Sequence, residues 1–253
     1  MEKYKTHLYI IFLIVLLIVQ YQFCKKYTNL KPYLDVVPPA FNTKTTKAFT
    51  FGDDEFYFRT KVLKVQNMGD TFGRVTALKD YDYKQLYDWI NNLDELNHES
   101  NFLPSISAYY FSQTQNIQDR IYPIKFLEKH AMRDIKHKWW WLYQAAFIAQ
   151  YDLKDKELAA KLAIELRDNA PADIPFLVKQ SIITHLNKNN QDCESLRMLN
   201  GMIDQYSDVE NEKDEKIKQQ KMAELNYMRY FIEKIIKKLK ENKIDVNKCL
   251  QQQ

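Results

Sequence analysis

The chain has 253 residues, of which 45% are hydrophobic, 14% aromatic and 28% charged, and this composition excludes a collagen-like or wholly disordered protein. It contains only 4 glycines, against roughly 18 for average usage, which disfavours turn-rich sheet folds and glycine-rich phosphate loops. The 37 basic residues exceed the 33 acidic ones by a net charge of +4, spread along the chain. Because nucleic-acid-binding proteins usually concentrate a basic excess in one stripe, we expect no nucleic-acid partner.

Residues 1–27 have the pattern of a membrane anchor. Leu8 to Val19 is an unbroken apolar run, which as a helix is about 18 Å long, against ~30 Å of hydrocarbon core. Tyrosines and lysines on both flanks extend it, because such side chains are suited to the membrane interface. We predict a single-pass helix in the cell (inner) membrane, spanning about residues 7–24, with the lipid bilayer as its partner. A cleaved signal peptide is the alternative, although no small-x-small cleavage site follows Val19.

The charges beside this segment leave the side of the soluble body undecided. Lys3 and Lys5 precede the apolar run, whereas Lys25, Lys26 and Lys31 follow it closely. The positive-inside rule therefore leans slightly towards a cytoplasmic body.

The three cysteines, Cys24, Cys193 and Cys249, are odd in number, and their spacing matches neither a disulfide framework nor a zinc site. We interpret Cys193 as a small apolar core residue. The absence of a disulfide pattern weakly favours a reducing compartment.

Residues 28–50 are predicted to be a linker. Three of the seven prolines lie here, and the pair Pro38-Pro39 favours extended geometry. Such a segment would space the body from the bilayer semi-rigidly.

The body, residues 51–208, has helical signals throughout and no convincing strand. Asp53 is a predicted N-cap for a helix that runs to about Asn67, and Gly69 is the predicted left-handed stop. An amphipathic helix follows from about Asp82, with apolar residues at steps of three and four. Further helices are expected at about 101–113, 117–134, 138–151, 154–168, 174–187 and 190–206.

A repeat organises these helices. Ala108, Ala145 and Ile182 recur at an interval of 37 residues, and the same step relates Tyr122, Ala159 and Leu196. Each unit is then two helices joined by a turn, which resembles a tetratricopeptide-type repeat of somewhat greater length. No full repeat signature occurs, and bulky Leu196 stands where small residues are usual. The predicted fold is all-α, an N-terminal transmembrane helix followed by a tetratricopeptide-like α-solenoid.

Residues 209–253 form a lysine-rich C-terminal region, with a long helix expected over 212–243. Its apolar residues follow alternating steps of three and four, the pattern of a coiled-coil seam: Leu225, Met228, Ile232, Ile235 and Leu239. The helix either caps the last repeat or pairs with a second copy of the chain in a homodimer.

The candidate binding residues are aromatic. Trp139, Trp140 and Trp141 are consecutive, and helical neighbours point about 100° apart, so at least one should be exposed and available to a protein partner. Tyr109 and Tyr110 have the same ambiguity. Core packing at a helix entry is the competing interpretation of both groups.

The segment 69–80 holds the other candidate chemistry. Arg74 and the backbone around two glycines could bind an anion, and Asp70 and Asp80 could serve an enzyme. A tight corner between helices explains the same residues without chemistry. The histidines show no two-histidine metal spacing such as HExxH. No nucleophile elbow or nucleotide fingerprint occurs, so we predict no catalytic residues, metal or cofactor.

Three stretches, 66–83, 100–116 and 138–159, together resemble an uncharacterised family of alphaproteobacterial single-pass membrane proteins with tetratricopeptide-like bodies. The resemblance covers roughly residues 50–190 and implies the anchor and the helical fold, but no activity and no functional residues. The leading hypothesis is a membrane-anchored protein-binding or assembly module. An envelope enzyme with a site near 69–80 and a structural dimerising protein are the alternatives.

Overall fold

The computed structural model describes residues 2–27, 36–71, 74–204, 206 and 209–251. The chain divides into two compact units, Met1–Pro38 and Pro39–Gln253. The described residues of the first unit contain one helix, α1 (Glu2–Tyr27). Its 18-residue segment Tyr9–Lys26 is long and apolar enough to cross a membrane, and none of it is buried inside the protein. A signal sequence near an N-terminus would meet the same criterion.

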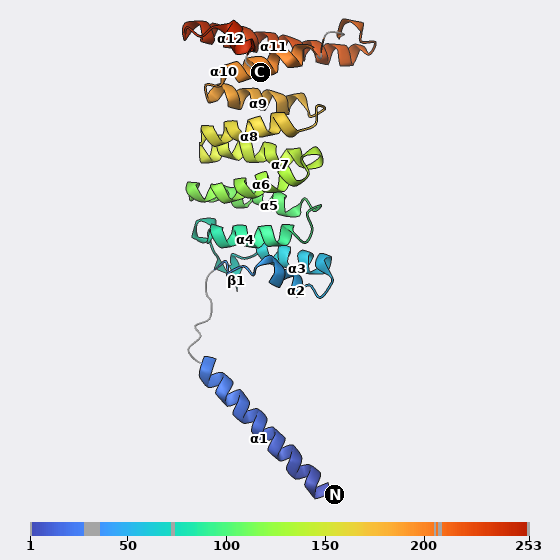
Figure 1. The fold of residues 1–253 in the computed structure, drawn as a ribbon, viewed down its shortest axis with the longest axis vertical. Coiled ribbons are helices and arrows are strands. Elements are labelled where there is room, and N and C mark those ends of the chain that lie inside the picture. The colour runs from blue at the N-terminus through green and yellow to red at the C-terminus, as the bar shows by residue number, and fades with distance from the viewer. Residues whose placement is uncertain (1, 28–35, 72–73, 205, 207–208, 252–253) are drawn as a thin grey trace. The chain divides into compact units, whose positions relative to one another are not determined.

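The second unit is a stack of helices with one very short strand pair (Figure 1). Its elements, in chain order, are α2 (Thr43–Ala48), α3 (Asp54–Gln66), β1 (Asp70–Thr71), β2 (Arg74–Val75), η1 (Leu78–Asp80), α4 (Tyr83–Asp94), α5 (Phe102–Tyr109), η2 (Phe111–Gln113), η3 (Ile117–Arg120), α6 (Ile121–Arg133), α7 (Ile135–Ile148), η4 (Ala149–Leu153), α8 (Lys156–Asn169), α9 (Phe176–Lys188), α10 (Asp192–Asp204), η5 (Val209–Asn211), α11 (Glu215–Glu241) and α12 (Val246–Gln251).

The 37-residue interval corresponds to the stacking of helix pairs. Contacts join α3 to α4, α5 to α6, α7 to α8 and α9 to α10, and each pair packs on the next. Ala108, Ala145 and Ile182 lie in the first helices of three successive pairs, and each is at most 3% exposed. The same interval relates a second buried set, Phe111, Ile148 and His185. The all-α, tetratricopeptide-like solenoid is therefore confirmed.

Residues 39–50 differ from the predicted linker, because they belong to the second unit and contain α2. Asn42 caps α2 by accepting a hydrogen bond from the Thr45 amide, and the Thr43 hydroxyl donates to Asn92 of α4 over 2.9 Å. These polar contacts tie α2 to the repeat body, and the sequence signal for them was hidden by the neighbouring prolines. Residues 28–35 of the predicted linker lie outside the described residues.

Helix α3 begins as predicted, with the Asp53 carboxylate accepting a hydrogen bond from the Phe56 amide. The prediction for Gly69 is wrong, since Gly52 is the one glycine with a positive φ among the described residues. Gly69 is instead needed for close packing, because a Cβ there would overlap the hydroxyl oxygen of Tyr81 and lie 3.1 Å from the Thr76 carbonyl oxygen. The two-residue ladder of β1 and β2 follows Gly69 and leaves the all-α class unchanged.

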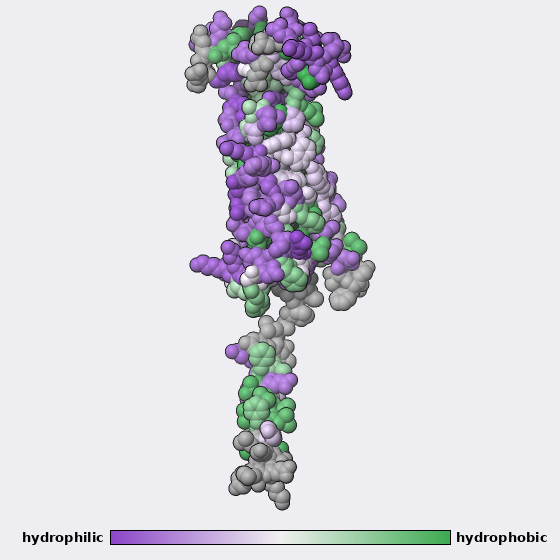
Figure 2. Space-filling model, turned by 90° about the vertical axis from the view of Figure 1, so that its right-hand side faces the viewer, coloured by the Kyte–Doolittle hydropathy of each residue, from purple (hydrophilic) through white to green (hydrophobic). Residues whose placement is uncertain are grey.

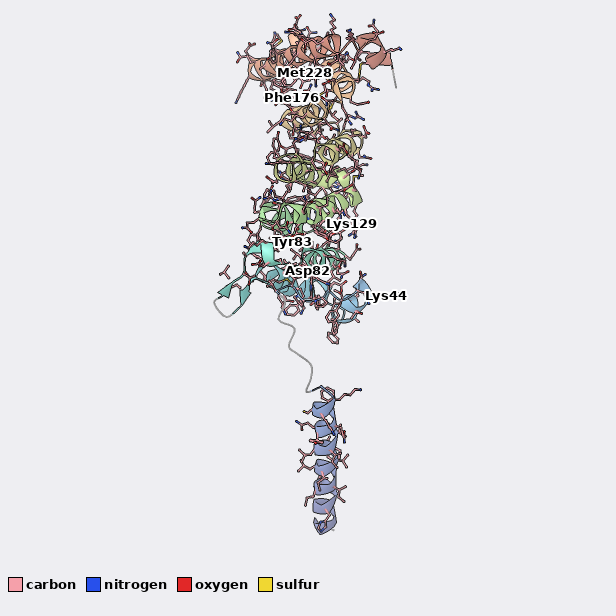
Figure 3. All side chains as sticks on the ribbon, turned by 90° about the vertical axis from the view of Figure 1, so that its left-hand side faces the viewer. Lys44, Asp82, Tyr83, Lys129, Phe176 and Met228 are labelled. Atoms are coloured by element: carbon pink, nitrogen blue, oxygen red, sulfur yellow. A yellow bond between two sulfur atoms is a disulfide. The ribbon has the colours of Figure 1, made fainter. Side chains whose placement is uncertain are left out.

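The long C-terminal helix caps the stack. In α11 the seam residues Leu225, Met228, Ile235 and Leu239 are buried, and Ile232 is partly buried. They pack in one apolar cluster with residues of α9 and α10, namely Ile183, Leu196, Leu199 and Met202. Figure 3 labels Met228 and Phe176, which meet at this end of the unit, and Tyr83 nearer the other end. Because the seam is covered within the chain, a homodimer through this helix, still a prediction, would need another of its faces.

Cys193 of α10 and Cys249 of α12 form a disulfide, which corrects the interpretation of Cys193 as a free apolar residue. The two positions are 56 residues apart in the chain. They meet because α11 crosses the last repeat and the chain then returns α12 to α10. The spacing of the cysteines in the sequence does not reveal that the chain turns back in this way, so the pairing was not predicted.

The surface of the second unit is unevenly polar. Figure 2 shows one side of it, on which near-neutral and apolar residues form a strip along the stack beside a hydrophilic area. A repeat stack of this kind presents an extended face rather than a single deep cleft.

Candidate protein-binding face

The three tryptophans of α7 point in three directions, as helix geometry requires. Trp141 is 7% exposed, and its indole N–H donates to the Asn101 side-chain oxygen at 3.1 Å. Trp139 is half-buried. Trp140 is 39% exposed, and its indole N–H donates to the hydroxyl of Tyr109 on α5 at 3.1 Å. Trp141 therefore serves the core, whereas Trp140 is available at the surface.

Trp140 begins a row of aromatic side chains that runs along α7 into η4. Tyr143, Phe147 and Tyr151 follow at steps of three, four and four residues, so they share one side of the helix. The ring centroids of Trp140 and Tyr143 are 5.2 Å apart, and those of Phe147 and Tyr151 are 4.6 Å apart. Phe147 and Tyr151 are exposed, as is Tyr109, which is 54% accessible. We call these five residues, Tyr109, Trp140, Tyr143, Phe147 and Tyr151, the aromatic face.

The row ends at a positive charge on the next repeat. The Lys188 ammonium of α9 lies 4.5 Å from the centroid of the Tyr151 ring, a cation–π contact, and 3.3 Å from its hydroxyl. The His185 ring also lies beside Tyr151, with centroids 6.0 Å apart. The aromatic face thus spans two successive pairs of the solenoid, from α5 to α7 and η4, and adjoins α9 of the next pair through Lys188.

Two of the predicted binding residues lie apart from this face. Tyr110 is exposed, but its ring packs on Phe111, 5.1 Å away between centroids, rather than on α7. Arg74 lies in β2, and its side chain is outside the described part of the chain. The prediction missed Tyr143, Phe147 and Tyr151, although their three- and four-residue spacing is visible in the sequence.

A buried polar cluster joins the ends of α4 and α6. The Asp94 carboxylate lies 2.7 Å from His130 Nδ1 through Oδ1, and 3.1 Å from His98 Nδ1 through Oδ2. Arg133 donates to the same Oδ2 at 3.1 Å. The His130 side chain is fully buried, Asp94 is nearly so, and the Nε2 atoms of both imidazoles have no hydrogen-bond partner in the part of the chain that the structure describes.

Burial and charge oppose each other in this cluster. Burial alone would raise the pKa of Asp94, but hydrogen bonds and charge from His130 and His98 outweigh it, and the pKa is lowered. Burial lowers the pKa of His130 by more than Asp94 raises it, which favours the neutral ring. Burial likewise lowers the pKa of Lys138, whose ammonium donates to the Glu99 carbonyl at 2.7 Å.

Sequence reasoning missed this cluster. Asp94, His98 and His130 offer ligand atoms within 4.8 Å of one another, a separation that a metal ion could bridge. However, donors already occupy both carboxylate oxygens, and Arg133 supplies the compensating positive charge. We assign the cluster a structural role, tying adjacent repeats. The sequence does show Asp94 and His98 four residues apart, about one helical turn. Their third partner, His130, lies in the next repeat, 36 residues after Asp94.

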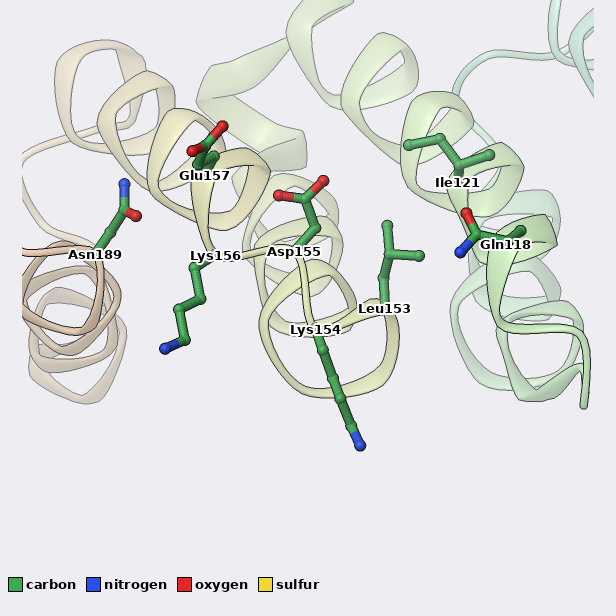
Figure 4. A pocket seen from close by; sticks show the side chains of 8 residues that line it. All are labelled: Gln118, Ile121, Leu153, Lys154, Asp155, Lys156, Glu157 and Asn189. Carbon is green, nitrogen blue, oxygen red and sulfur yellow. The ribbon is translucent and has the colours of Figure 1, made fainter.

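A shallow, open surface hollow lies at the turns between repeats (Figure 4). It is lined by Gln118, Ile121, Leu153, Lys154, Asp155, Lys156, Glu157 and Asn189. Asp155 is used as the N-cap of α8, accepting from the Leu158 amide at 2.9 Å, and the Lys154 and Lys156 side chains extend away from the ribbon. Asp70 and Asp80, the residues of the predicted enzyme alternative, are both exposed to solvent. Among the described side chains, neither place brings a nucleophile together with a base.

Comparison with protein families, with characterised proteins and with solved structures found no match. The resemblance to an alphaproteobacterial membrane-protein family therefore remains a prediction.

Proposed function

We propose that this chain is a membrane-anchored helical-repeat protein that binds a protein partner through the aromatic face. The observation that carries the proposal is the row of rings along α7 and η4, of which Trp140, Phe147 and Tyr151 are exposed. The row is joined to Tyr109 on α5 and to Lys188 on α9. Large amphipathic rings are the side chains most often responsible for binding energy at protein interfaces. Each carries an apolar body, and the Trp and Tyr members add a polar tip.

The fold supports the same proposal. A solenoid stacks its pairs into an extended surface on which consecutive repeats can contact one partner, and here two of them contribute rings and a third contributes the adjoining Lys188. The α1 helix is long and apolar enough to hold such a surface at a membrane. Assembly of partners beside the membrane is the role that these features favour.

The test uses the full chain in membranes. Chemical crosslinking followed by mass spectrometry is carried out with the wild type, with the double variant Trp140→Ala/Tyr151→Ala, and with Phe56→Ala as a matched control. Phe56 lies on α3, is 67% exposed and is outside the aromatic face. We expect the partner recovered with the wild type to be recovered equally with Phe56→Ala and at least about tenfold less with the double variant. Equal recovery with the double variant, at unchanged helicity by circular dichroism, would remove the aromatic face from the account.

A further inference from the structure

Among the described residues of the C-terminal helix α12, Cys249 and Val246 pack on the body. Among its described side chains, Cys249 is 2% exposed, Val246 is partly buried, and the others are exposed. A helix of six residues does not form by itself in water. The bond from Cys249 to Cys193 is therefore the covalent attachment of α12 to α10, beside the packing of Val246 on the apolar cluster.

The surroundings of the bond are those of a built cross-link. The two Cα atoms are 4.9 Å apart, within the usual range for a disulfide. Cys249 belongs to the apolar cluster under α11, and Cys193 is partly buried and packs against that cluster. Next to Cys193 on α10, the Asp192 carboxylate forms an ion pair with Lys238 of α11 at 2.9 Å. This ion pair also joins α10 to α11 beside the disulfide.

The disulfide indicates the kind of compartment in which the repeat body resides. Disulfides form and persist in oxidising compartments, whereas the cytosol keeps thiols reduced. In a reducing compartment Cys193 and Cys249 would be thiols, and α12 would lose the attachment described above. The lysines flanking α1, two before and three after the apolar run, give only a small bias in the other direction.

We propose that the Cys193–Cys249 disulfide is formed on the oxidising side of the membrane, so that the N-terminus of α1 faces the cytoplasm and the repeat body faces outward. The step is a thiol–disulfide exchange with a thiol oxidoreductase. The two thiols lose two protons and two electrons and become the disulfide, while the disulfide of the oxidoreductase becomes a dithiol. This inference rests on the membrane anchoring proposed above.

The experiment uses the full chain with Cys24→Ala, expressed in bacterial cells, so that Cys193 and Cys249 are its two remaining cysteines. Cells are quenched in acid to trap thiol states, the chain is denatured, and a maleimide–polyethylene glycol tag is added before or after reduction. We expect no tag before reduction and two tags after it. A matched chain with Cys249→Ala in addition should take one tag in both cases. Two tags on the Cys24→Ala chain before reduction would overturn the proposal.

A second measurement separates this proposal from the anchoring on which it rests. Protease added to spheroplasts should digest the body without lysis, and protection of the body until lysis would overturn the outward orientation. A soluble, shortened chain that still carries the disulfide would instead show that α1 is a cleaved signal. In that outcome the anchoring fails while the assignment of the oxidising compartment stands.

Discussion

Reducing the Cys193–Cys249 bond should loosen the C-terminal cap without disturbing the middle of the solenoid. The bond closes a loop of 56 residues. The chain-entropy relation for a loop of that length gives about 14 cal/mol/K, or about 4 kcal/mol at 25 °C. This stabilisation acts on the state in which α11 and α12 have detached from α10, because the cross-link limits the freedom of that state.

The effect should be local because a repeat stack is stabilised mainly through neighbouring contacts. Helix α11 contacts α10, η5 and α12, and α12 contacts α10 and α11. A loss of about 4 kcal/mol corresponds to an increase of about 10³-fold in the opening equilibrium of this cap. The apolar contacts of Met228, Ile235 and Leu239 remain after reduction, so the cap should still be folded most of the time.

Hydrogen exchange followed by mass spectrometry, on the full chain in detergent with and without a reductant, measures this directly. Amides of α11 and α12 should exchange faster after reduction, whereas those of α6 and α7 should be unchanged. A Cys249→Ala variant is the control, since its exchange should not respond to the reductant. Equal exchange in α11 before and after reduction, or an increase spread evenly along the stack, would refute the reasoning.

Three further outcomes are expected from urea unfolding of the full chain. Gly201→Ala should raise the free energy of unfolding by about 1 kcal/mol, because Gly201 lies inside α10 with open space around its Cα; a decrease would show that the space is filled. Gly69→Ala should lower it by about 2 kcal/mol, because the new Cβ would overlap the Tyr81 hydroxyl, and an unchanged midpoint would contradict that packing. Burial, followed by the charge of Lys188, lowers the pKa of His185 to about 4. The unfolded chain then takes up this proton near pH 6.5 while the folded chain does not, so stability should fall by about 3 kcal/mol between pH 7 and pH 4. His185→Gln should remove that part of the pH dependence, and an unchanged profile would show that other groups cause it.

The helical architecture was predictable because it depends on local patterns in the sequence. Ala108, Ala145 and Ile182 recur at one interval, and a solenoid buries equivalent residues in each repeat. The cap at Asp53 is equally local, since a carboxylate need only reach the third amide after it. Such signals depend on residues a few positions apart and are not altered by distant packing.

The parts that escaped prediction depend on contacts between distant segments. The disulfide requires α11 to return α12 to α10, and the Asp94–His130 pair joins residues 36 positions apart. Gly69 suggested a helix stop, but the glycine is required by Tyr81, which approaches from beyond the hairpin.

For the aromatic face, the three consecutive tryptophans drew attention to α7. Two of them are partly or largely buried, however. Phe147 and Tyr151, which look like ordinary core residues in the sequence, are exposed instead.

The central claim, that the aromatic face of α7 binds a partner, is tested most directly by site-specific photocrosslinking in membranes. A benzophenone amino acid replaces Trp140 in one full-length chain and the exposed Lys125 of α6 in another. The account predicts one adduct of defined mass at position 140 and none at position 125. No adduct at position 140, or the same adducts at both positions, would contradict it.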